Sequence, residues 1–392
     1  MRRAFWMAYA LVVVTVPWAE APARAGDAVP DAVTLSQALD LVESQKPDSQ
    51  AARLQIAQAE AARVVARQLP NPSLSTAVGS VALSQTQPPG LSVGETIQTG
   101  VALTQPLILW GKRGLRTEGA NAGIAVARGQ ERDLVRQLQA AVKEAYFRTL
   151  RDARVLVFAT ENERRYREGV ALNARRFRSK DISEVEFRKI ELEGLGFLSA
   201  LEDARRSSAE SQNSLGRLVG AERPIAALDE PAVPVIPEDA NALVPRGLEH
   251  RPDLLALEQS REQANLALRL AKRDRYPDVT VGTNYINDQW TRGGDMRNTI
   301  GFSFSVPLPL LNQNQGPIAQ ADVAVRQADT ELTRLRLDIG REIRDALAAY
   351  QSARTLRQTY EAGYLEKAQV TVTGTAASYR AGSASLIDYL DA

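Results

Sequence analysis

The 392-residue chain has no cysteine and a single histidine, His250. Without thiols it forms no disulfides, and no cysteine can carry a lipid. One histidine, no cysteine and three methionines cannot assemble a metal cluster of the usual ligand types, so neither a bound metal nor a cofactor is expected. His250 lies in the segment 249–252 and is interpreted as a surface residue rather than a base or ligand.

Catalytic motifs are also missing. There is no phosphate-binding glycine loop, and no Ser/His/Asp set stands at a workable spacing, so the sequence does not predict an enzyme. Lys and Arg total 48 against 47 Asp and Glu. This near balance provides no strong positive field, and nucleic acid is not an expected partner.

Long apolar runs are scarce. The N-terminus has the basic pair Arg2 and Arg3, an apolar run over residues 4–16 and the small-residue pattern of residues 23–25, which together predict a secretory signal peptide, cleaved after Ala25. The run is shorter than the roughly 20 residues that a spanning helix needs. No other segment is apolar and long enough, so any membrane-embedded part must be β-structure.

Proline is absent from two long stretches, between Pro106 and Pro224 and after Pro317. Both stretches are free to form very long helices, because proline breaks helix interiors. Apolar residues recur at helical spacing in the first, for example Leu134 and Leu138. A helix over residues 115–178 would be on the order of 100 Å long at 1.5 Å per residue.

The chain repeats one plan twice. Residues 46–48 (KPD) recur as 251–253 (RPD), residues 100–107 recur as 301–308, and Phe177-Arg178 recurs as Tyr379-Arg380, always in the same order and at offsets of 201 to 205. Each half is predicted to run helix, two strands, long helix, turn and returning helix. We assign residues 26–220 to the first repeat, 221–245 to a proline-rich linker, and 246–392 to the second repeat. Thr34 with Gln37 predicts a capping box at the first helix.

Two strands are predicted in each half, over residues 73–85 and 96–105 and over 278–289 and 298–306. In the last, Ile300, Phe302 and Phe304 alternate with Ser303 and Ser305. Such alternation fits a strand with lipid on its apolar side and a water-filled lumen on the other, although a soluble sheet with one buried face remains an alternative. Four strands are too few to close a barrel, so further copies must complete it.

The plan as a whole resembles the TolC-like outer-membrane factors, and residues 380–392 (RAGSASLIDYLDA) are similar to the tip and gate of that family. The resemblance implies a mostly helical fold, with a long periplasmic coiled-coil barrel and four strands per chain in the 12-strand transmembrane barrel of a homotrimer. It further implies outer-membrane lipid around the strands and, as partners, a periplasmic membrane-fusion adaptor and an inner-membrane RND-type pump. Because the family continues with a returning helix, the sequence is expected to be truncated at Ala392.

Two further segments, 109–113 (LWGKR) and 307–316, resemble the branch for divalent heavy metals (cobalt/zinc/cadmium, copper/silver). The expected function is therefore a passive outer-membrane duct of a tripartite efflux system, for metal cations or other toxic small molecules. Two alternatives remain open. One is a periplasmic coiled-coil adaptor or scaffold, and the other is a drug-efflux or type I secretion duct of the same fold.

Candidate site residues lie at the two predicted hairpin turns. Asp388 and Asp391 stand three apart on a helix and so share a face; the resemblance makes them the pore gate, where six acids from three chains would favour cations. Asp388 could equally cap the helix that begins after Ser385, as Glu186 is predicted to do after Ser183. By resemblance, the turns themselves contact the adaptor: Arg178, Ser179, Lys180, Asp181, Arg380, Ala381, Gly382 and Ser383.

Overall fold

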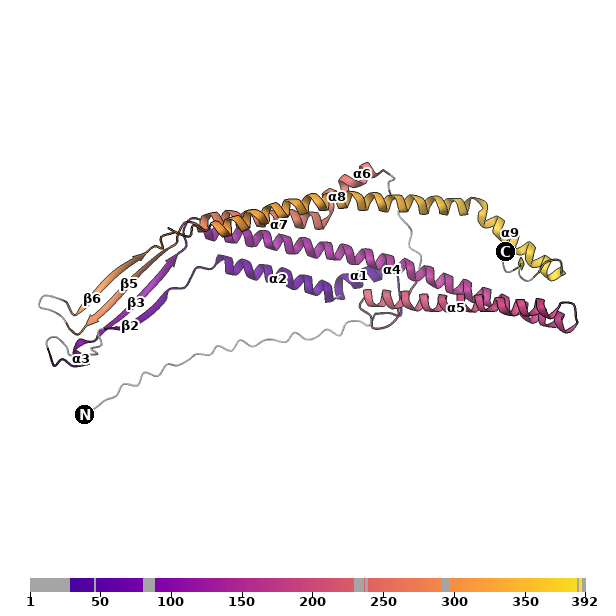
Figure 1. Ribbon diagram of the computed structural model, residues 1–392, viewed down its shortest axis with the longest axis horizontal. Coiled ribbons are helices and arrows are strands. Elements are labelled where there is room, and N and C mark those ends of the chain that lie inside the picture. Colours follow the sequence, from indigo (N-terminus) through magenta and orange to yellow (C-terminus); the bar gives the residue numbers. More distant parts are fainter. Residues whose placement is uncertain are drawn as a thin grey trace, which may run out of the picture.

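The computed structural model describes residues 29–45, 47–79, 89–228, 236, 239–290, 296–385 and 388–389. The predicted signal peptide and Asp391 lie outside these residues. The described chain is an elongated body with a β-sheet at one end and long helices over the remainder (Figure 1). The chain is mostly helical with few strands, as the sequence predicts.

The elements follow the duplicated plan. In the first half these are β1 (Ala32–Val33), α1 (Leu35–Gln45), α2 (Pro47–Arg67), β2 (Ser73–Gly79), α3 (Val93–Thr96), β3 (Gln98–Leu107), α4 (Lys112–Arg178), α5 (Glu184–Leu218) and β4 (Ala226–Ala227). In the second they are α6 (Ala240–His250), α7 (Pro252–Asp274), β5 (Val279–Asp288), β6 (Asn298–Ser305), α8 (Gln315–Thr359), a π-helical turn η1 (Tyr360–Tyr364) and α9 (Leu365–Ala381).

The sheet is antiparallel with the order β2-β3-β5-β6, so the two halves meet where β3 pairs with β5. Leu103 lies opposite Thr283, which in turn lies opposite Phe302. Because alternate residues share a face, the register collects apolar side chains on one side of the sheet: Leu74, Val78, Val101, Leu103, Val281, Tyr285, Ile300, Phe302 and Phe304. All of them are exposed, Phe302 by 89%. The opposite face carries small and polar residues such as Gly282 and Ser303.

The helices form a layer that continues the sheet. Helix α4 packs against α2 on one side and α7 on the other, and α7 packs against α8, so the helices keep the order of the strands. Gly129 of α4 lies so close to Ala256 of α7 that an added Cβ would stand 2.7 Å away. Helix α4 is 67 residues long, on the order of 100 Å, and confirms the helix predicted from the missing prolines. No helix in the described part of the chain is both long and apolar enough to cross a bilayer.

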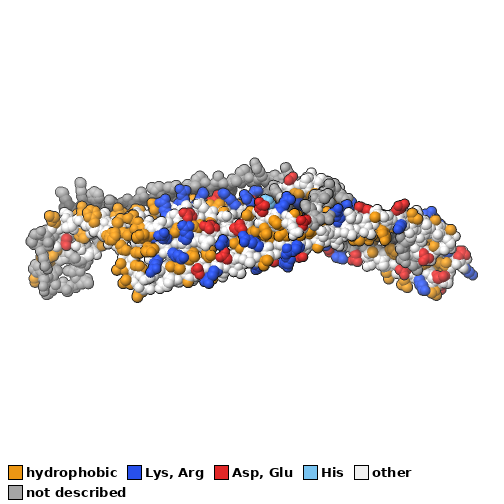
Figure 2. Space-filling view, turned by 90° about the horizontal axis from the view of Figure 1, so that it is seen from above, with side chains coloured by type: hydrophobic (Ala, Val, Ile, Leu, Met, Phe, Trp, Pro, Cys, Tyr) orange, Lys and Arg blue, Asp and Glu red, His pale blue; other side chains and the backbone are white. Residues whose placement is uncertain are grey.

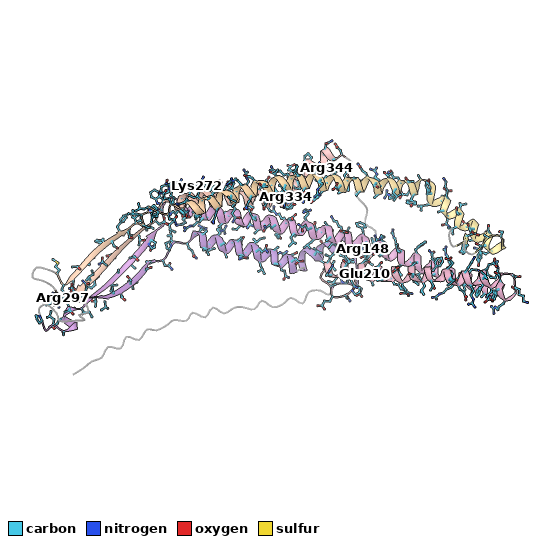
Figure 3. All side chains as sticks on the ribbon, viewed as in Figure 1. Arg148, Glu210, Lys272, Arg297, Arg334 and Arg344 are labelled. Carbon is cyan, nitrogen blue, oxygen red and sulfur yellow. The ribbon has the colours of Figure 1, made fainter. Side chains whose placement is uncertain are left out.

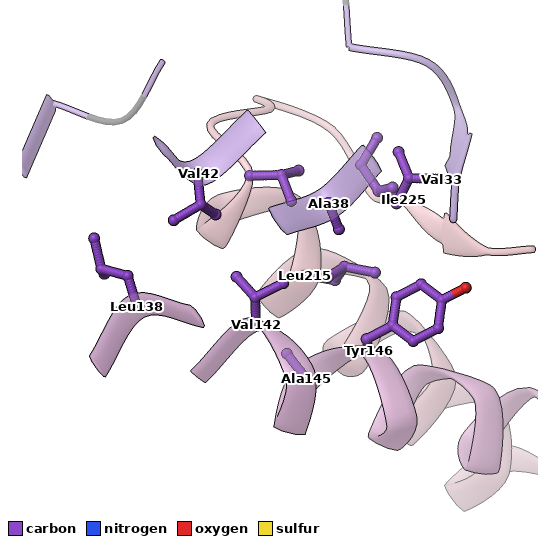
Figure 4. Close-up of a cluster of buried hydrophobic side chains, with 10 residues drawn as sticks. Val33, Ala38, Val42, Leu138, Val142, Ala145, Tyr146, Leu215 and Ile225 are labelled. Carbon is purple, nitrogen blue, oxygen red and sulfur yellow. The ribbon is translucent and has the colours of Figure 1, made fainter. Parts of the chain in front are cut away.

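The densest core lies midway along α4 (Figure 4). Val142 and Tyr146 of α4 and Leu215 at the end of α5 are fully buried, together with Val33 and Ile225. Next to this cluster β1 and β4 form a short parallel pair, with Ala32 opposite Ala226. The predicted Thr34–Gln37 capping box is present, with the Thr34 amide 3.0 Å from the Gln37 side-chain oxygen. This core joins the first helix, the α4–α5 hairpin and the start of the linker.

The second proline-free stretch is not one continuous helix. Within η1, Ala362 leaves helical geometry and Gly363 adopts a φ of 113°, which glycine tolerates because it has no Cβ. The chain bends there, and α9 turns toward the end of the α4–α5 hairpin (Figure 1). Counting prolines predicts where helices can run but does not detect this break, which brings the second turn close to the first.

Hydrophobic side chains gather where the sheet joins the helices, whereas Lys, Arg, Asp and Glu are interspersed along the helical layer (Figure 2). Leu308, Leu310 and Leu311, between β6 and α8, are among these exposed apolar residues, with Leu311 exposed by 94%. The composition of the surface therefore changes at the junction between the sheet and the helices.

Candidate functional site: the two hairpin turns

Helix α4 ends in a turn that satisfies its last carbonyl groups. The Lys180 amide donates to Phe177 O at 3.0 Å and the Asp181 amide donates to Arg176 O at 2.8 Å, the two bonds of a Schellman motif. Lys180 holds the left-handed conformation that this motif requires, at a φ of 66°. Ser179 closes the turn, since its hydroxyl lies 2.6 Å from Asp181 Oδ2.

Helix α9 ends in the same way. The Gly382 amide donates to Tyr379 O at 3.1 Å and the Ser383 amide to Ser378 O at 2.9 Å, while Gly382 has a φ of 81°. Gly382 thus occupies the position of Lys180, at an offset of 382 − 180 = 202. All eight residues predicted for the turns are exposed. The two turns are structural repeats of each other.

A capping box follows each turn. Ser183 accepts from the Glu186 amide at 3.2 Å, and the Glu186 carboxylate accepts from the Ser183 amide at 2.8 Å, as predicted from the sequence. Ser385 and Asp388 repeat this pattern at 3.1 and 2.9 Å. Asp388 therefore makes the capping interaction that the sequence left as one of two alternatives. The gate alternative requires Asp391, which lies outside the described residues.

The capping hydrogen bonds lower the pKa of both carboxyl groups. The Ser385 hydroxyl, 2.7 Å from Asp388 Oδ2, and the Ser385 amide lower the pKa of the exposed Asp388 carboxyl. At the first turn, the Ser183 amide and hydroxyl lower the pKa of Glu186 in the same way. Each capping acid is therefore negatively charged at neutral pH and available to an approaching cation.

Aromatic pairs lie behind both turns. Phe177 stacks on Phe187 with ring centres 5.2 Å apart, and Tyr379 stacks on Tyr389 at 5.5 Å. The pairs are equivalent, because 379 − 177 and 389 − 187 are both 202. The second pair carries hydroxyl groups that the first lacks.

The Tyr379 hydroxyl joins the two halves. Asn173 of α4 donates from Nδ2 to Tyr379 Oη at 2.8 Å, and the Arg176 guanidinium lies 5.5 Å from the centre of the Tyr379 ring. Both Asn173 and Tyr379 are buried, and Tyr379 packs on Ile190 of α5. The sequence repeat aligned Tyr379 with Phe177 but did not mark either as functional. The only signal was the exchange of phenylalanine for tyrosine at a repeated position.

No group of three or more His, Asp or Glu side chains in the described part of the chain is arranged to hold a metal ion. His250 ends α6 and is exposed, with Glu249 as its near neighbour at 3.8 Å. Neither observation adds a site to the two turns.

The fold is that of an outer-membrane channel subunit. The structure of the Campylobacter jejuni CmeC outer membrane channel superimposes with a TM-score of 0.74 at 17% identity, over 91% of this chain and 79% of that one. The chain belongs to the outer membrane efflux protein family, whose model matches residues 38–221 and 243–392. It is therefore an outer-membrane component of an efflux system, and the resemblance found in the sequence is confirmed.

Two relatives come from Cupriavidus metallidurans. The cobalt-zinc-cadmium resistance protein CzcC is 24% identical over 361 residues, which are 92% of this chain and 83% of the relative. The nickel and cobalt resistance protein CnrC is 27% identical over 319 residues, or 81% of this chain and 73% of the relative. Both are named for resistance to metals.

Proposed function

We propose that the protein is the passive exit duct of a three-part efflux system that exports divalent metal cations. The observation that supports a duct most strongly is the described sheet, whose apolar face is exposed while its other face is small and polar. A buried soluble sheet would cover such a face, whereas lipid on one side and water on the other match both faces. Family membership favours this duct over a periplasmic adaptor or scaffold.

The strand count requires more than one copy of the chain, and the proposed number of three comes from the family resemblance. The edge strands of the described sheet are β2 and β6, and four strands are too few to close into a barrel. Open edges are costly in lipid, so each β6 would pair with β2 of the next copy. Three copies would supply twelve strands, and the helical layers would extend the same wall into the periplasm.

The turns would form the far end of the duct. Their eight exposed residues are proposed to contact a periplasmic adaptor that connects the channel to an inner-membrane RND-type pump. The first turn follows three arginines and the second follows Arg380 alone, so the first is the more basic of the two. Each turn also presents a capping carboxylate, from Glu186 or Asp388. We propose that Asp388 and Asp391 of three copies narrow the entrance and favour cations by their negative charge.

The metal substrate rests on the two resistance relatives and on the resemblance of residues 109–113 and 307–316 to the metal branch. It is tested by deleting the gene and measuring growth on cobalt, zinc, cadmium and nickel salts beside dyes and antibiotics. Increased sensitivity to the metals, restored by the wild-type gene, is expected. Sensitivity confined to dyes and antibiotics would instead support a drug-efflux duct, and defective export of a protein would support a secretion duct.

A further inference from the structure

A groove of about 650 Å³ opens where the helical layer meets the sheet. It lies between the start of α4 and the end of α7, and Lys272 marks its place at the sheet end of the helices (Figure 3). Its lining combines two aromatic rings, three cations and a single acid: Trp110, Gly111, Gly114, Leu115, Glu118, Arg269, Lys272, Arg273 and Tyr276.

The cations of the groove are available to a ligand. Arg269, Lys272 and Arg273 are exposed, and none of them forms an ion pair with another described residue. Glu118 is the only acid in the lining, so the groove carries a net positive charge of two if all four groups are ionised. An anion that entered the groove would meet three donors without displacing an existing salt bridge.

The two aromatic residues of the groove are anchored by hydrogen bonds, and Lys112 beside the groove supplies one of them. Lys112 is almost completely buried, donates from Nζ to Tyr276 O at 2.7 Å and lies 3.0 Å from Asp278 Oδ1. Trp110 Nε1 donates to Pro277 O at 2.8 Å, and its ring lies 5.5 Å from that of Tyr276. The Trp110 side chain is nevertheless half exposed. The two rings are therefore held in place with one side open, the arrangement favoured at a lipid headgroup level.

The groove lies on the same side of the molecule as the apolar sheet face. Gln289, which follows β5, donates to Ile97 O beside β3, so the odd-numbered residues of β5 direct their amides toward β3. Consider the sheet viewed from its apolar face, which carries the odd-numbered side chains of β5, with the helices at the bottom so that β5 runs upward. In this view the handedness of L-residues places β3 to the right of β5. The viewer then sees α8, α7, α4 and α2 from left to right.

The right-handed turn of α4 completes the placement. Leu115 and Ala122 pack toward α7, and Arg128 pairs with Glu60 of α2. Successive residues of a helix are rotated by about 100° about its axis. Gly114 and Glu118 therefore lie between the side of α4 that faces α7 and the side that faces α2, on the surface turned toward the viewer. The groove therefore opens just below the apolar strands on the side that would face lipid, not the lumen.

We propose that this groove binds the headgroup phosphate of an anionic phospholipid, in the membrane leaflet next to the helical body. Arg269, Lys272 and Arg273 would hold the phosphate, while Trp110 and Tyr276 would lie among the headgroups. The inference rests on the proposed insertion of the strands into the membrane. Helices α4 and α7 are the inner pair of the layer, so a second copy that joins at α2 or α8 leaves the groove open to lipid.

The test compares phospholipid retention in the purified channel by native mass spectrometry. The wild type, loaded with equal phosphatidylglycerol and phosphatidylcholine, should retain phosphatidylglycerol preferentially. The variant Lys272→Gln/Arg273→Gln should lose this preference by about 25-fold, because each of the two cations contributes a factor of about five near a membrane surface. The control Arg132→Gln/Lys143→Gln also removes two positive charges, at positions about 30 and 45 Å from the start of α4. It should behave like the wild type.

An unchanged preference in the Lys272→Gln/Arg273→Gln variant would overturn the proposal, as would equal losses in both variants. Displacement of the lipid by millimolar inorganic phosphate would identify a free-phosphate site and also overturn it. Failure of membrane insertion has a different signature, because the wild type would then retain neither phospholipid. The proposed function and the lipid site therefore fail in distinguishable ways.

Discussion

The two hairpin turns share one backbone conformation but differ in their side chains. Both use a left-handed residue, a Schellman pair and a serine capping box, at a constant offset of 202. The first has a Phe–Phe stack, three arginines in the last turn of its helix and a glutamate in the cap, whereas the second has a Tyr–Tyr stack, one arginine and an aspartate in the cap. The turn itself therefore fixes only the shape. Duplication has left the side chains free to take different roles, and the second turn carries the proposed gate.

The largest effect is expected from the acids of the second turn. Asp388→Ala/Asp391→Ala should raise single-channel conductance severalfold and weaken the preference for cations, because it removes the negative charge of the proposed constriction. The equivalent change in the first turn, Glu186→Ala/Lys189→Ala, is the matched control and should leave both properties unchanged. Recordings in planar bilayers would measure them. Equal effects of the two variants would show that the halves have not diverged in function.

Loss of the Tyr379 hydroxyl should have a moderate effect. Tyr379→Phe leaves Asn173 without one of its two acceptors in a buried place and should lower the free energy of unfolding by about 1–2 kcal/mol. Tyr389→Phe keeps the stack and should cost less than about 0.5 kcal/mol. Thermal denaturation of both variants checks the difference. If they melted together, the hydroxyl bond between the halves would contribute nothing measurable.

Exchange of the left-handed residues tests whether the turns are equivalent. Lys180→Gly should stabilise the first turn by about 1 kcal/mol, because glycine adopts a positive φ without a Cβ penalty, and Gly382→Lys should destabilise the second by a similar amount. Denaturant unfolding measures both. Changes of the same sign would contradict the shared geometry.

The smallest effect concerns pH. The cap lowers the Asp388 pKa, so its contribution to stability is complete above the ordinary carboxyl pKa of about 4 and is lost as pH falls through the lowered value. A ring of acids in a trimer would act in the opposite direction, since repulsion between like charges raises carboxyl pKa values. Cation selectivity that falls already above pH 4 would indicate the ring. Selectivity that persists below about pH 4 would contradict a ring of mutually repelling acids, because carboxyls with raised pKa values would be neutral there.

The sequence predicted those features that depend on local rules. The absence of proline predicted α4, and Ser183 with Glu186 predicted a cap, because both depend on a few neighbouring residues. Alternation over residues 298–306 predicted which side chains share a face of β6. The family resemblance, carried by residues across the whole chain, predicted the fold.

Tertiary contacts were not predictable in the same way. In the sequence, Gly363 cannot be distinguished from any other glycine in a helical pattern. In the structure the helix breaks at Gly363, and α9 then contacts α4. The Asn173–Tyr379 bond joins residues 206 positions apart, and Lys112 is buried only because Asp278 and Tyr276 O approach from the other half. None of these partners can be chosen from sequence spacing alone.

Cysteine labelling of β6 tests whether the strands line a water-filled duct through lipid. The chain has no native cysteine, so single cysteines at Phe302, Ser303, Phe304 and Ser305 need no background correction. In outer membranes, a water-soluble thiol reagent should label positions 303 and 305 and leave 302 and 304 unlabelled. Equal labelling of all four, or labelling of 302 and 304 alone, would contradict the proposed orientation of the sheet in the membrane.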